Sequence, residues 1–221
     1  MTQGLSTDAM KSFIHTYPGM GLWPTVGRDV LLKGDFEFAA TSDGVEVHDT
    51  YQLRIEVPQY PALLPRVFEV GGRIKPVADQ HAFASGQLCL GSELRLRTII
   101  GATLDLLHFA DKCIVPYLYA TTRRGVEGRY IFGELAHDSP GLLADYMNLF
   151  GVHDEASVIA AFRILTTKPS SADRHPCPCS CGKRLVQCSF KSRISEIRGL
   201  APRGVFRQIF ASTFPVARNS K

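Results

Sequence analysis

Alternating apolar and polar residues mark three extended segments in the first third of the chain. Apolar side chains recur at every second position in residues 30–39 and 45–57, as in a half-buried strand, and residues 66–74 form a shorter segment of the same kind. Thr41–Gly44 separates the first two and suits a tight hairpin, because its Asp-Gly pair supplies the positive-φ position. Short connections between successive strands predict an antiparallel meander rather than a parallel sheet.

Apolar residues spaced three and four positions apart predict helices on both sides of these strands. The expected helices, with an N-cap where the sequence offers one, are 7–16 with Thr7, about 98–119, 140–150 with Ser139, 155–165 with Asp154, 195–200 and 205–212. Pro116 should kink the second of these or end its regular part, and residues 123–128 should form a break. The order of helix, strands and then helices predicts an α+β protein.

Charge is distributed unevenly along the chain. From Asp173 to Lys221 the sequence holds ten Lys/Arg against two Asp/Glu, a net charge of +8, whereas the residues before it carry −4. No run of 18 apolar residues occurs, and residues 1–6 contain no basic region followed by an apolar core. We therefore expect no transmembrane helix and no secretory signal, and a cytoplasmic protein whose six cysteines stay reduced.

One cysteine follows a glycine-containing turn, between the expected strands and the later helices. Cys89 lies three residues after Gly86 and eight after His81, and alternation would place Leu88 and Leu90 in the core with the cysteine on the opposite side. A thiolate is the strongest nucleophile among ordinary side chains. The residues alone allow two interpretations: a nucleophile on a fixed backbone, or a small buried hydrophobic residue.

The segment around this cysteine resembles the core of ubiquitin-conjugating (UBC) enzymes. Tyr60-Pro61, Pro65, the strand 67–70, His81 and the run from Gly86 to Leu90 are similar to that family's Tyr-Pro…Pro segment, the histidine of its His-Pro-Asn motif and its cysteine site. The resemblance is closest to divergent bacterial members found in antiphage-defence operons. It implies a UBC-like fold over residues 1–168, with an N-terminal helix, a four-stranded antiparallel meander and C-terminal helices.

The same resemblance implies an acyltransferase with Cys89 as the nucleophile that carries a protein C-terminus as a thioester. His81 is then either a base or a residue that pins the loop by hydrogen bonding. The acyl group comes from a ubiquitin-like protein, supplied by a separate activating enzyme, or from the cyclic-oligonucleotide nucleotidyltransferase of a CBASS defence system. Two departures limit the resemblance. The family's asparagine, which is associated with lysine attack on the thioester, is absent after His81, and the interval from His81 to Cys89 is shorter than in most members, so the loop must be tighter. A catalytically silent binding module is the alternative.

Four cysteines lie within twelve residues near the C-terminal end: Cys177, Cys179, Cys181 and Cys188. In a reducing compartment this clustering predicts a tetrahedral thiolate site, for which Zn²⁺ fits best. The segment 175–191 resembles the SEC-C motif, the zinc knuckle at the C-terminus of the SecA translocation ATPase. The first three metal ligands of the SEC-C motif match Cys177, Cys179 and Cys188, but Ser189 stands where the motif has its fourth ligand. Cys181 or His175 would then complete the coordination.

Such a knuckle, joined by a linker over residues 169–174, is expected to fold on its metal and to dock onto a partner. Another interpretation makes this zinc region primary and the chain a targeting adaptor. The basic tail, residues 192–221, interleaves arginines with Phe206 and Phe210, whose spacing suits a helix face that packs on something. Contact with nucleic acid or phosphate, or docking onto an acidic protein, stays open for this tail.

Two further pairs of polar residues could carry chemistry. His137 and Asp138 form either a catalytic pair or a turn before the next helix. Adjacent side chains seldom point the same way, which favours the turn. Asp105 and His108 are expected on the solvated side of a helix.

Overall fold

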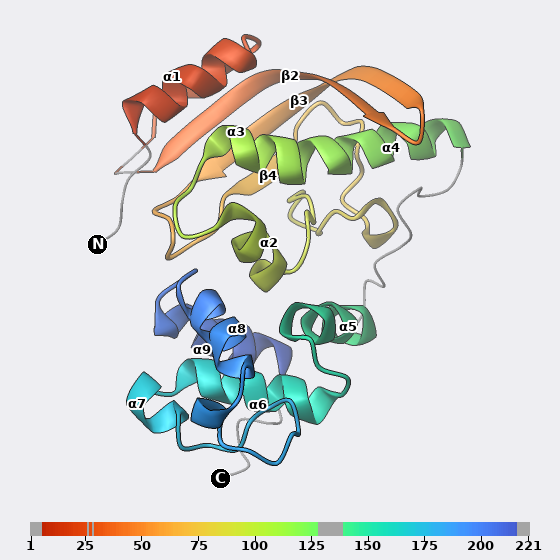
Figure 1. The fold of residues 1–221 in the computed structure, drawn as a ribbon. Helices are drawn as coiled ribbons and strands as arrows, with labels where there is room; N and C mark the ends of the chain where they lie inside the picture. Colours follow the sequence, from red (N-terminus) through yellow and green to blue (C-terminus); the bar gives the residue numbers. More distant parts are fainter. Residues whose placement is uncertain (1–5, 26, 28, 128–138, 216–221) are drawn as a thin grey trace. The chain divides into compact units, whose positions relative to one another are not determined.

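The computed structural model describes residues 6–25, 27, 29–127 and 139–215 (Figure 1). The chain forms two compact units, and neither is continuous in sequence. The sheet unit consists of Met1–Gly91 and Ile99–Glu134, and the helical unit of Ser92–Thr98 and Leu135–Lys221. The boundary expected after residue 168 therefore falls inside the helical unit. Among the described residues, no helix is both long enough and apolar enough to cross a membrane.

The sheet is an antiparallel meander, as the alternation predicted. Its strands β1 (Met20–Trp23), β2 (Val30–Ser42), β3 (Val45–Val57) and β4 (Arg66–Glu69) lie side by side in chain order. β2 and β3 pair along their whole length, from Val30 opposite Val57 to Ser42 opposite Val45. Asp43 and Gly44 connect them with φ values of 50° and 75°, which matches the tight hairpin expected there.

One face of the sheet is buried beneath helices. α4 (Val115–Glu127) contacts β2 and β3, and α1 (Thr7–Thr16) contacts α3 (Leu106–Phe109) (Figure 1). Alternate strand residues supply much of the resulting core, which includes Phe13, Leu32, Phe36, Tyr51, Leu53, Ile55, Val67, Leu106, Ile114 and Leu118. The N-cap of α1 is Ser6 rather than Thr7, because the Ser6 hydroxyl accepts a hydrogen bond from the Ala9 N–H at 3.1 Å.

The helix expected over residues 98–119 is interrupted. α2 (Glu93–Ile100) ends at Gly101, whose φ of +82° turns the chain, and α3 begins again after Asp105. The Asp105 carboxylate accepts hydrogen bonds from the N–H groups of Leu107 and His108 at 2.9 and 3.3 Å, so it is an N-cap. Asp105 and His108 are both exposed, as expected.

Pro116 changes the helix that contains it without ending it. Residues Ala110–Ile114 form a π-helical turn, in which the Val115 N–H bonds back to the Ala110 carbonyl. A proline cannot donate to the carbonyl four residues before it, so a wider turn just ahead of it accommodates the ring. The helix then continues to Glu127, through the break expected at residues 123–128.

The resemblance implies four strands, but the residue pattern marks only three of them and misses the first. β1 is short and follows a Tyr-Pro-Gly turn, and it pairs with the start of β2 from Met20 opposite Gly34. A Cβ on Gly34 would lie 2.1 Å from the carbonyl oxygen of Gly19, and Gly34 has a φ of +150°. A glycine is therefore required where these two strands approach each other.

The helical unit is built from α5 (Ser139–Phe150), α6 (Glu155–Thr166), α7 (Pro169–Ala172), α8 (Phe190–Arg198) and α9 (Arg203–Thr213). Asp154 caps α6 as predicted, since its carboxylate accepts from the Ser157 N–H at 2.8 Å. The segment expected as a linker is α7, and its Ala172 is fully buried. The core includes Leu94, Tyr146, Phe150, Phe162, Leu165, Leu185, Phe190, Ile194, Ile197, Val205, Phe206 and Ile209.

The aromatic side chains of the basic tail pack within this unit. The Phe210 ring stacks on Phe162 of α6 with 5.9 Å between centroids, and Phe214 lies 6.0 Å from the same ring. Phe206 is 1% exposed. The helix face predicted from the Phe206–Phe210 spacing is therefore covered by α6 of the same chain, because α9 is part of this core.

An acidic pH should weaken the sheet unit through Asp49. Its carboxylate accepts two hydrogen bonds from Arg73 at 2.8 Å and one from Thr122 of α4 at 2.8 Å, and Arg73 holds the pKa of Asp49 at about 2. This folded pKa lies below the ordinary value, so the stabilisation is complete above pH 4 to 5 and is lost as the pH falls through about 2.

We expect Asp49→Asn to lower the free energy of unfolding by about 1–2 kcal/mol at pH 7. Urea titrations at pH 7 and pH 2 should show the gap between wild type and variant closing at the lower pH. A gap of equal size at both pH values would contradict this account.

Candidate nucleophile and candidate metal centre

The segment around Cys89 is a tight hairpin. The Cys89 N–H donates to the His81 carbonyl at 2.7 Å, and the Phe83 N–H donates to the Gln87 carbonyl at 2.9 Å. Gly86 has a φ of +81° and closes the turn, with its N–H on the Phe83 carbonyl at 2.8 Å. The glycine-containing turn was predicted, and the backbone pairing of residues 81 and 89 explains why the interval between them is short.

This hairpin is fixed to both the sheet and α4. The Leu88 N–H donates to the Val67 carbonyl on β4 at 2.8 Å, and the Leu88 side chain is 2% exposed. From α4, the Tyr117 hydroxyl donates to the carbonyl of Gln80 at 2.7 Å and approaches that of His81 at 3.4 Å. The backbone of Cys89 is thus held from two sides, which suits a group that must meet a reactant in a defined geometry.

The Cys89 side chain is half-buried and its thiol is not activated in the resting protein. Burial raises the pKa of Cys89, and a hydrogen bond from the Gly91 backbone N–H offsets part of this rise. The sulfur is therefore a thiol at neutral pH, and any attack requires removal of its proton as the reactant binds. Cys113 differs from it: that side chain is in the core, burial raises its pKa to about 11, and it is inert.

His81 fixes the loop through its main chain. Its backbone has the left-handed values φ 49° and ψ 42°, directly after the short helical turn Ala78–Gln80. Its carbonyl accepts the Cys89 N–H, so the main chain of this residue helps to fix the loop. The role of its ring as a base stays a prediction.

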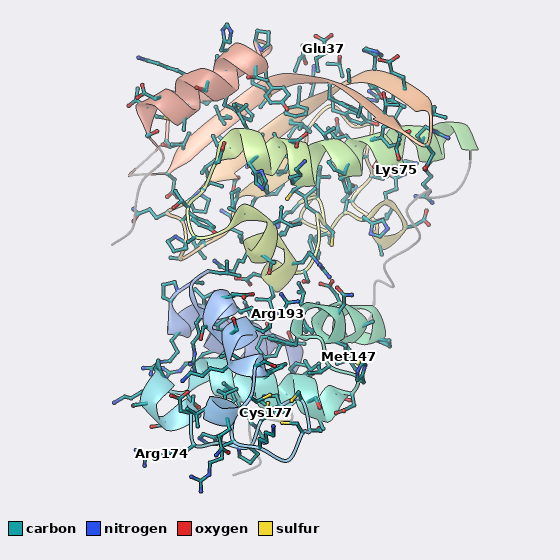
Figure 2. The ribbon with its side chains drawn as sticks, in the orientation of Figure 1. Glu37, Lys75, Met147, Arg174, Cys177 and Arg193 are labelled. Atoms are coloured by element: carbon teal, nitrogen blue, oxygen red, sulfur yellow. The ribbon has the colours of Figure 1, made fainter. Side chains whose placement is uncertain are left out.

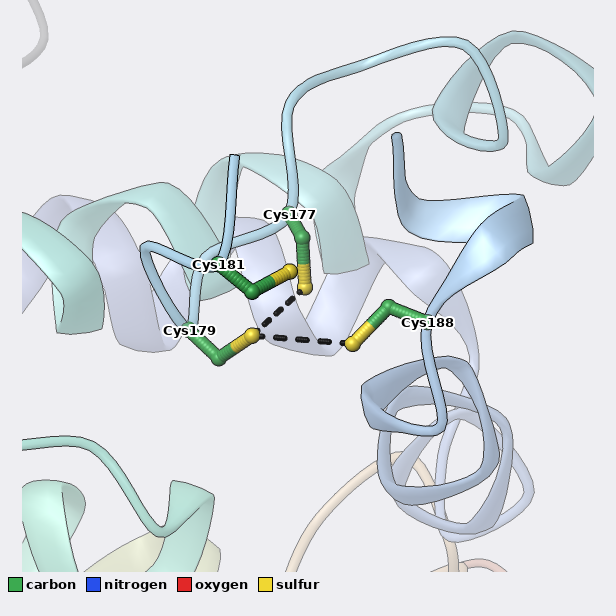
Figure 3. A group of neighbouring side chains, drawn as sticks. All are labelled: Cys177, Cys179, Cys181 and Cys188. Atoms are coloured by element: carbon green, nitrogen blue, oxygen red, sulfur yellow. Dashed lines mark hydrogen bonds between the residues drawn. The ribbon is translucent and has the colours of Figure 1, made fainter. Parts of the chain in front are cut away.

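The four cysteines near the C-terminal end gather in one place (Figure 3). All four sulfur atoms lie within 4.8 Å of one another. The Cys179 sulfur is 3.1 Å from that of Cys177 and 3.6 Å from that of Cys188. Zn–S bonds of about 2.3 Å in a tetrahedron require sulfur atoms about 3.8 Å apart. The cluster fits such an ion after shifts of less than about an ångström.

Two left-handed residues shape this cluster. The Cys177 N–H donates to the Lys183 carbonyl at 2.9 Å, so the chain reverses between these two residues. Ser180 and Gly182, with φ values of 60° and 74°, form the turn that directs the cysteines inward. The Phe190 N–H donates to the Cys188 sulfur at 3.5 Å and, as the main cause, lowers the pKa of Cys188 to about 7. An N–H aimed at a sulfur stabilises a thiolate ligand.

Cys181 lies in the same group as the other three cysteines, and His175 is not part of that group. Among the His, Cys, Asp and Glu residues that the structure describes, only these four cysteines form such a group. Cys181 is exposed and Cys177 is buried, so one side of the cluster faces solvent. Four protein thiolates are soft ligands that favour Zn²⁺, and they leave no open position for a substrate. A metal held here would be structural, and none of the four residues would be catalytic.

The knuckle is packed into the helical unit rather than standing alone. Cys177 and Leu185, 6% and 0% exposed, belong to the same hydrophobic core as Phe162, and Cys179 and Cys188 pack against it. Figure 2 labels Cys177 among the side chains of this unit. In addition, the Ser180 hydroxyl lies 3.5 Å from that of Ser157 on α6. The expectation of a knuckle without a core is wrong, because its residues belong to the core of the helical unit. Docking onto a separate partner stays a prediction.

Sequence reasoning missed one polar cluster in the helical unit. Arg95 donates from Nε and Nη2 to Asp145 Oδ1 at 2.9 and 2.5 Å, and the Ser92 hydroxyl donates to Asp145 Oδ2 at 2.5 Å. Arg95 also donates to the Asn148 side chain at 3.0 Å. These residues are about 50 positions apart in sequence, and no local pattern joins them. The other catalytic candidates, His137 and Asp138, lie outside the described residues.

Comparison with protein-family models, with curated proteins and with solved structures found no match to this chain.

Proposed function

We propose that this protein is an acyltransferase of the ubiquitin-conjugating type, with Cys89 as its nucleophile. The observation that carries the proposal is the half-buried Cys89 at the end of a hairpin that hydrogen bonds fix to β4 and α4. The element order supports it: an N-terminal helix, a four-stranded meander, the cysteine segment and then helices is the layout that the sequence resemblance implies. A buried core cysteine needs neither an accessible sulfur nor a hairpin of this kind.

The proposed step is a thioester exchange at Cys89. Its sulfur attacks the carbonyl carbon of an activated protein C-terminus, a new C–S bond forms, and the bond to the donor's leaving group breaks. The proton leaves the Cys89 thiol for the His81 ring or for solvent. An attacking amine then takes the acyl group, and the Cys89 thiol is regenerated.

The acyl donor in this proposal is a ubiquitin-like protein delivered by a separate activating enzyme, or the C-terminus of a cyclic-oligonucleotide nucleotidyltransferase. Either setting would place the protein in cytoplasmic antiphage defence. The absence of the family's asparagine after His81 removes one donor to the oxyanion, a loss that typically costs about 10²–10³-fold in kcat. Transfer to an ordinary lysine is therefore not assumed.

The test is adduct formation by the purified protein. Wild type is incubated with each candidate donor, ATP and the matching activating enzyme, and is separated on gels with and without reductant. We expect an adduct that thiols cleave, and with Cys89→Ser an adduct that thiols do not cleave, because an oxygen ester replaces the thioester.

Cys113→Ser serves as the matched control, and it should still form a thiol-sensitive adduct. If no donor gives an adduct with wild type while the donor still binds, the protein is the silent binding module instead. The raised pKa of Cys89 is the observation that favours this second candidate.

A further inference from the structure

Both carboxylates in the last quarter of the chain are already paired. Beyond residue 172 the only acidic residues are Asp173 and Glu196, against ten Lys/Arg. Asp173 forms an ion pair with Lys191 at 2.9 Å, and Glu196 lies 3.7 Å from Arg193. In the described part of this region, no other cation has a carboxylate within ion-pair distance.

This excess of positive charge belongs to the helical unit alone. By sequence, that unit holds fourteen Lys/Arg against seven Asp/Glu, a net charge of +7, and the sheet unit holds eleven against fourteen, a net charge of −3. Positive charges gathered on one unit repel each other and raise the local concentration of anions. An anionic partner would therefore be attracted to the helical unit rather than to the sheet unit.

Three of the cations without a carboxylate lie together on a short ribbon at the cysteine cluster. Pro176 and Arg184 face each other in an antiparallel bridge. Next to it, the Cys177 N–H donates to the Lys183 carbonyl at 2.9 Å, and Arg174 precedes the bridge by two residues. The side chains of Arg174, Lys183 and Arg184 are all exposed, and we call these three residues the basic ribbon.

The backbone beneath the basic ribbon is held in place by the core. Cys177 and Leu185 are 6% and 0% exposed and belong to the hydrophobic core of the helical unit. The Leu185 N–H also donates to the His175 carbonyl at 3.0 Å, which pairs the two segments a second time. Because this backbone is already ordered, only side-chain freedom is lost when the three cations engage a ligand.

The surface chemistry of the helical unit fits nucleic acid better than protein. Protein interfaces are built around aromatic and aliphatic side chains that become buried, whereas nucleic-acid interfaces are more polar and much more positively charged. Among the described residues of this unit, Val186 is the only large hydrophobic side chain that is exposed. Two of the three cations are arginines, whose planar fork matches two phosphate oxygens at once.

The same surface fits a duplex better than a single strand. Proteins that bind single strands stack the bases on exposed aromatic rings. The described residues of the helical unit include no exposed aromatic side chain, since Phe210 is half-buried and the others are buried. Contact is then restricted to the phosphate backbone, which is densest in charge in a duplex, with one negative charge per about 1.7 Å.

We propose that the basic ribbon binds duplex nucleic acid through its phosphate backbone, without reading the base sequence. Three phosphate contacts correspond to a dissociation constant on the order of 10⁻⁴–10⁻⁶ M, the range of binding without sequence specificity. This binding is independent of the proposed activity at Cys89 and stands or falls separately from it.

The first measurement is fluorescence anisotropy with the full-length protein purified with zinc. The probes are fluorescein-labelled DNA and RNA duplexes of about 20 base pairs, titrated between about 50 and 200 mM salt. We expect binding of at least one duplex, with log Kd rising against log salt concentration with a slope close to ~2.7, about 0.9 for each phosphate contacted. No binding of either duplex at the lowest salt concentration would overturn the proposal.

The variant that tests the assignment replaces all three cations: Arg174→Gln, Lys183→Gln and Arg184→Gln. It should weaken binding at least about tenfold at the lowest salt concentration and remove most of the salt dependence, because the phosphate contacts are lost. Metal content and melting temperature should stay at the wild-type values, since none of the three residues is a candidate ligand.

The matched control removes the same charge from exposed lysines outside the basic ribbon: Lys11→Gln, Lys75→Gln and Lys168→Gln. It should change the affinity by less than about threefold and keep the wild-type slope, because distant exposed charges are largely screened. Equal losses in the two triple variants would mean that net charge alone attracts the duplex, and would overturn the basic ribbon as its site.

Two further measurements complete the test. If the triple variant loses its metal, Arg174→Glu replaces it, because Arg174 lies outside the turn that holds the cysteines; it should weaken binding at least about threefold, and an unchanged affinity would overturn the proposal. Poly-L-glutamate, compared at equal charge, should displace the labelled duplex at least about tenfold less well than unlabelled duplex does, because its charges are more widely spaced. Equal displacement would assign the basic ribbon to an acidic protein instead and overturn the nucleic-acid assignment.

Discussion

Chelation of a metal held by the four clustered cysteines should destabilise the helical unit and leave the sheet unit folded. The cysteine cluster is packed against α6 and α8, and without a cation its sulfur atoms, all within 4.8 Å, cannot ionise together. A metal present at 1,000 times its dissociation constant stabilises the folded form by about 4 kcal/mol. For a unit of this size that corresponds to a fall of about 15–30 °C in melting temperature on chelation.

The two units can be followed separately in one sample. The only tryptophan, Trp23, lies on β1 and reports on the sheet unit, whereas helical circular dichroism reports on both units. After chelation in the presence of a phosphine reductant, the melting temperature from circular dichroism should fall while that from tryptophan fluorescence stays. Simultaneous unfolding by both probes would contradict independent units, and no change in either would show that the cluster carries no stabilising metal.

Single substitutions should rank the four ligands by burial. Cys177→Ser should lose the metal, because a buried ligand position cannot be replaced by water. Cys181→Ser, at the exposed position, should keep the metal with weaker affinity, since water can take the fourth place. Cys89→Ser is the control outside the cluster, and metal analysis of the purified variants checks the order.

Phe162→Ala should lower the free energy of unfolding of the helical unit by about 3–5 kcal/mol. The ring is fully buried at the centre of the core, and four aromatic side chains pack on it within 6.0 Å between centroids: Tyr146, Phe150, Phe210 and Phe214. Removing it leaves a cavity that α5 and α9 would both have to collapse to fill, and close-packed cores relax only in part.

Urea titrations followed by circular dichroism measure this loss, while tryptophan fluorescence should report an unchanged sheet unit. Phe83→Ala is the matched control, because that side chain is 52% exposed and its loss should cost no more than about 0.5 kcal/mol. A cost below about 1 kcal/mol for Phe162→Ala would mean that the ring is not the centre of this core.

The periodic parts of the fold could be predicted from the sequence. Residues 45–57 alternate without interruption, and β3 has those bounds. The prediction fails where a single backbone angle or a contact with a distant segment determines whether an element forms or where it ends. Gly101 ends α2 through its positive φ, whereas Gly125 lies inside α4 without disturbing it, and the residue type is the same in both places. β1 exists because β2 offers it an edge, which no short sequence pattern reveals.

The candidate sites, too, could be predicted where their residues are close in sequence and could not where distant segments meet. Spacing alone identified the cysteine cluster, because metal ligands of this kind are close in sequence. It did not show that Cys177 lies in a core with Phe162, since the contact joins distant segments. The turn before Cys89 was readable from Gly86, but the hydrogen bond from Leu88 to Val67 and the link from Arg95 to Asp145 are long-range.

Each unit is built from two separate segments of the chain, which restricts where the chain can be truncated. Leu94 comes from within the N-terminal half, yet it is buried in the core that α6, α8 and α9 complete. A truncation after residue 168 would leave Leu94 and Phe162 without the helices that cover them. The cysteine-rich region is therefore not a separate domain that could be removed without loss of the helical unit. The helical unit therefore stays intact only if Ser92–Thr98 and the helices after residue 138 are kept together.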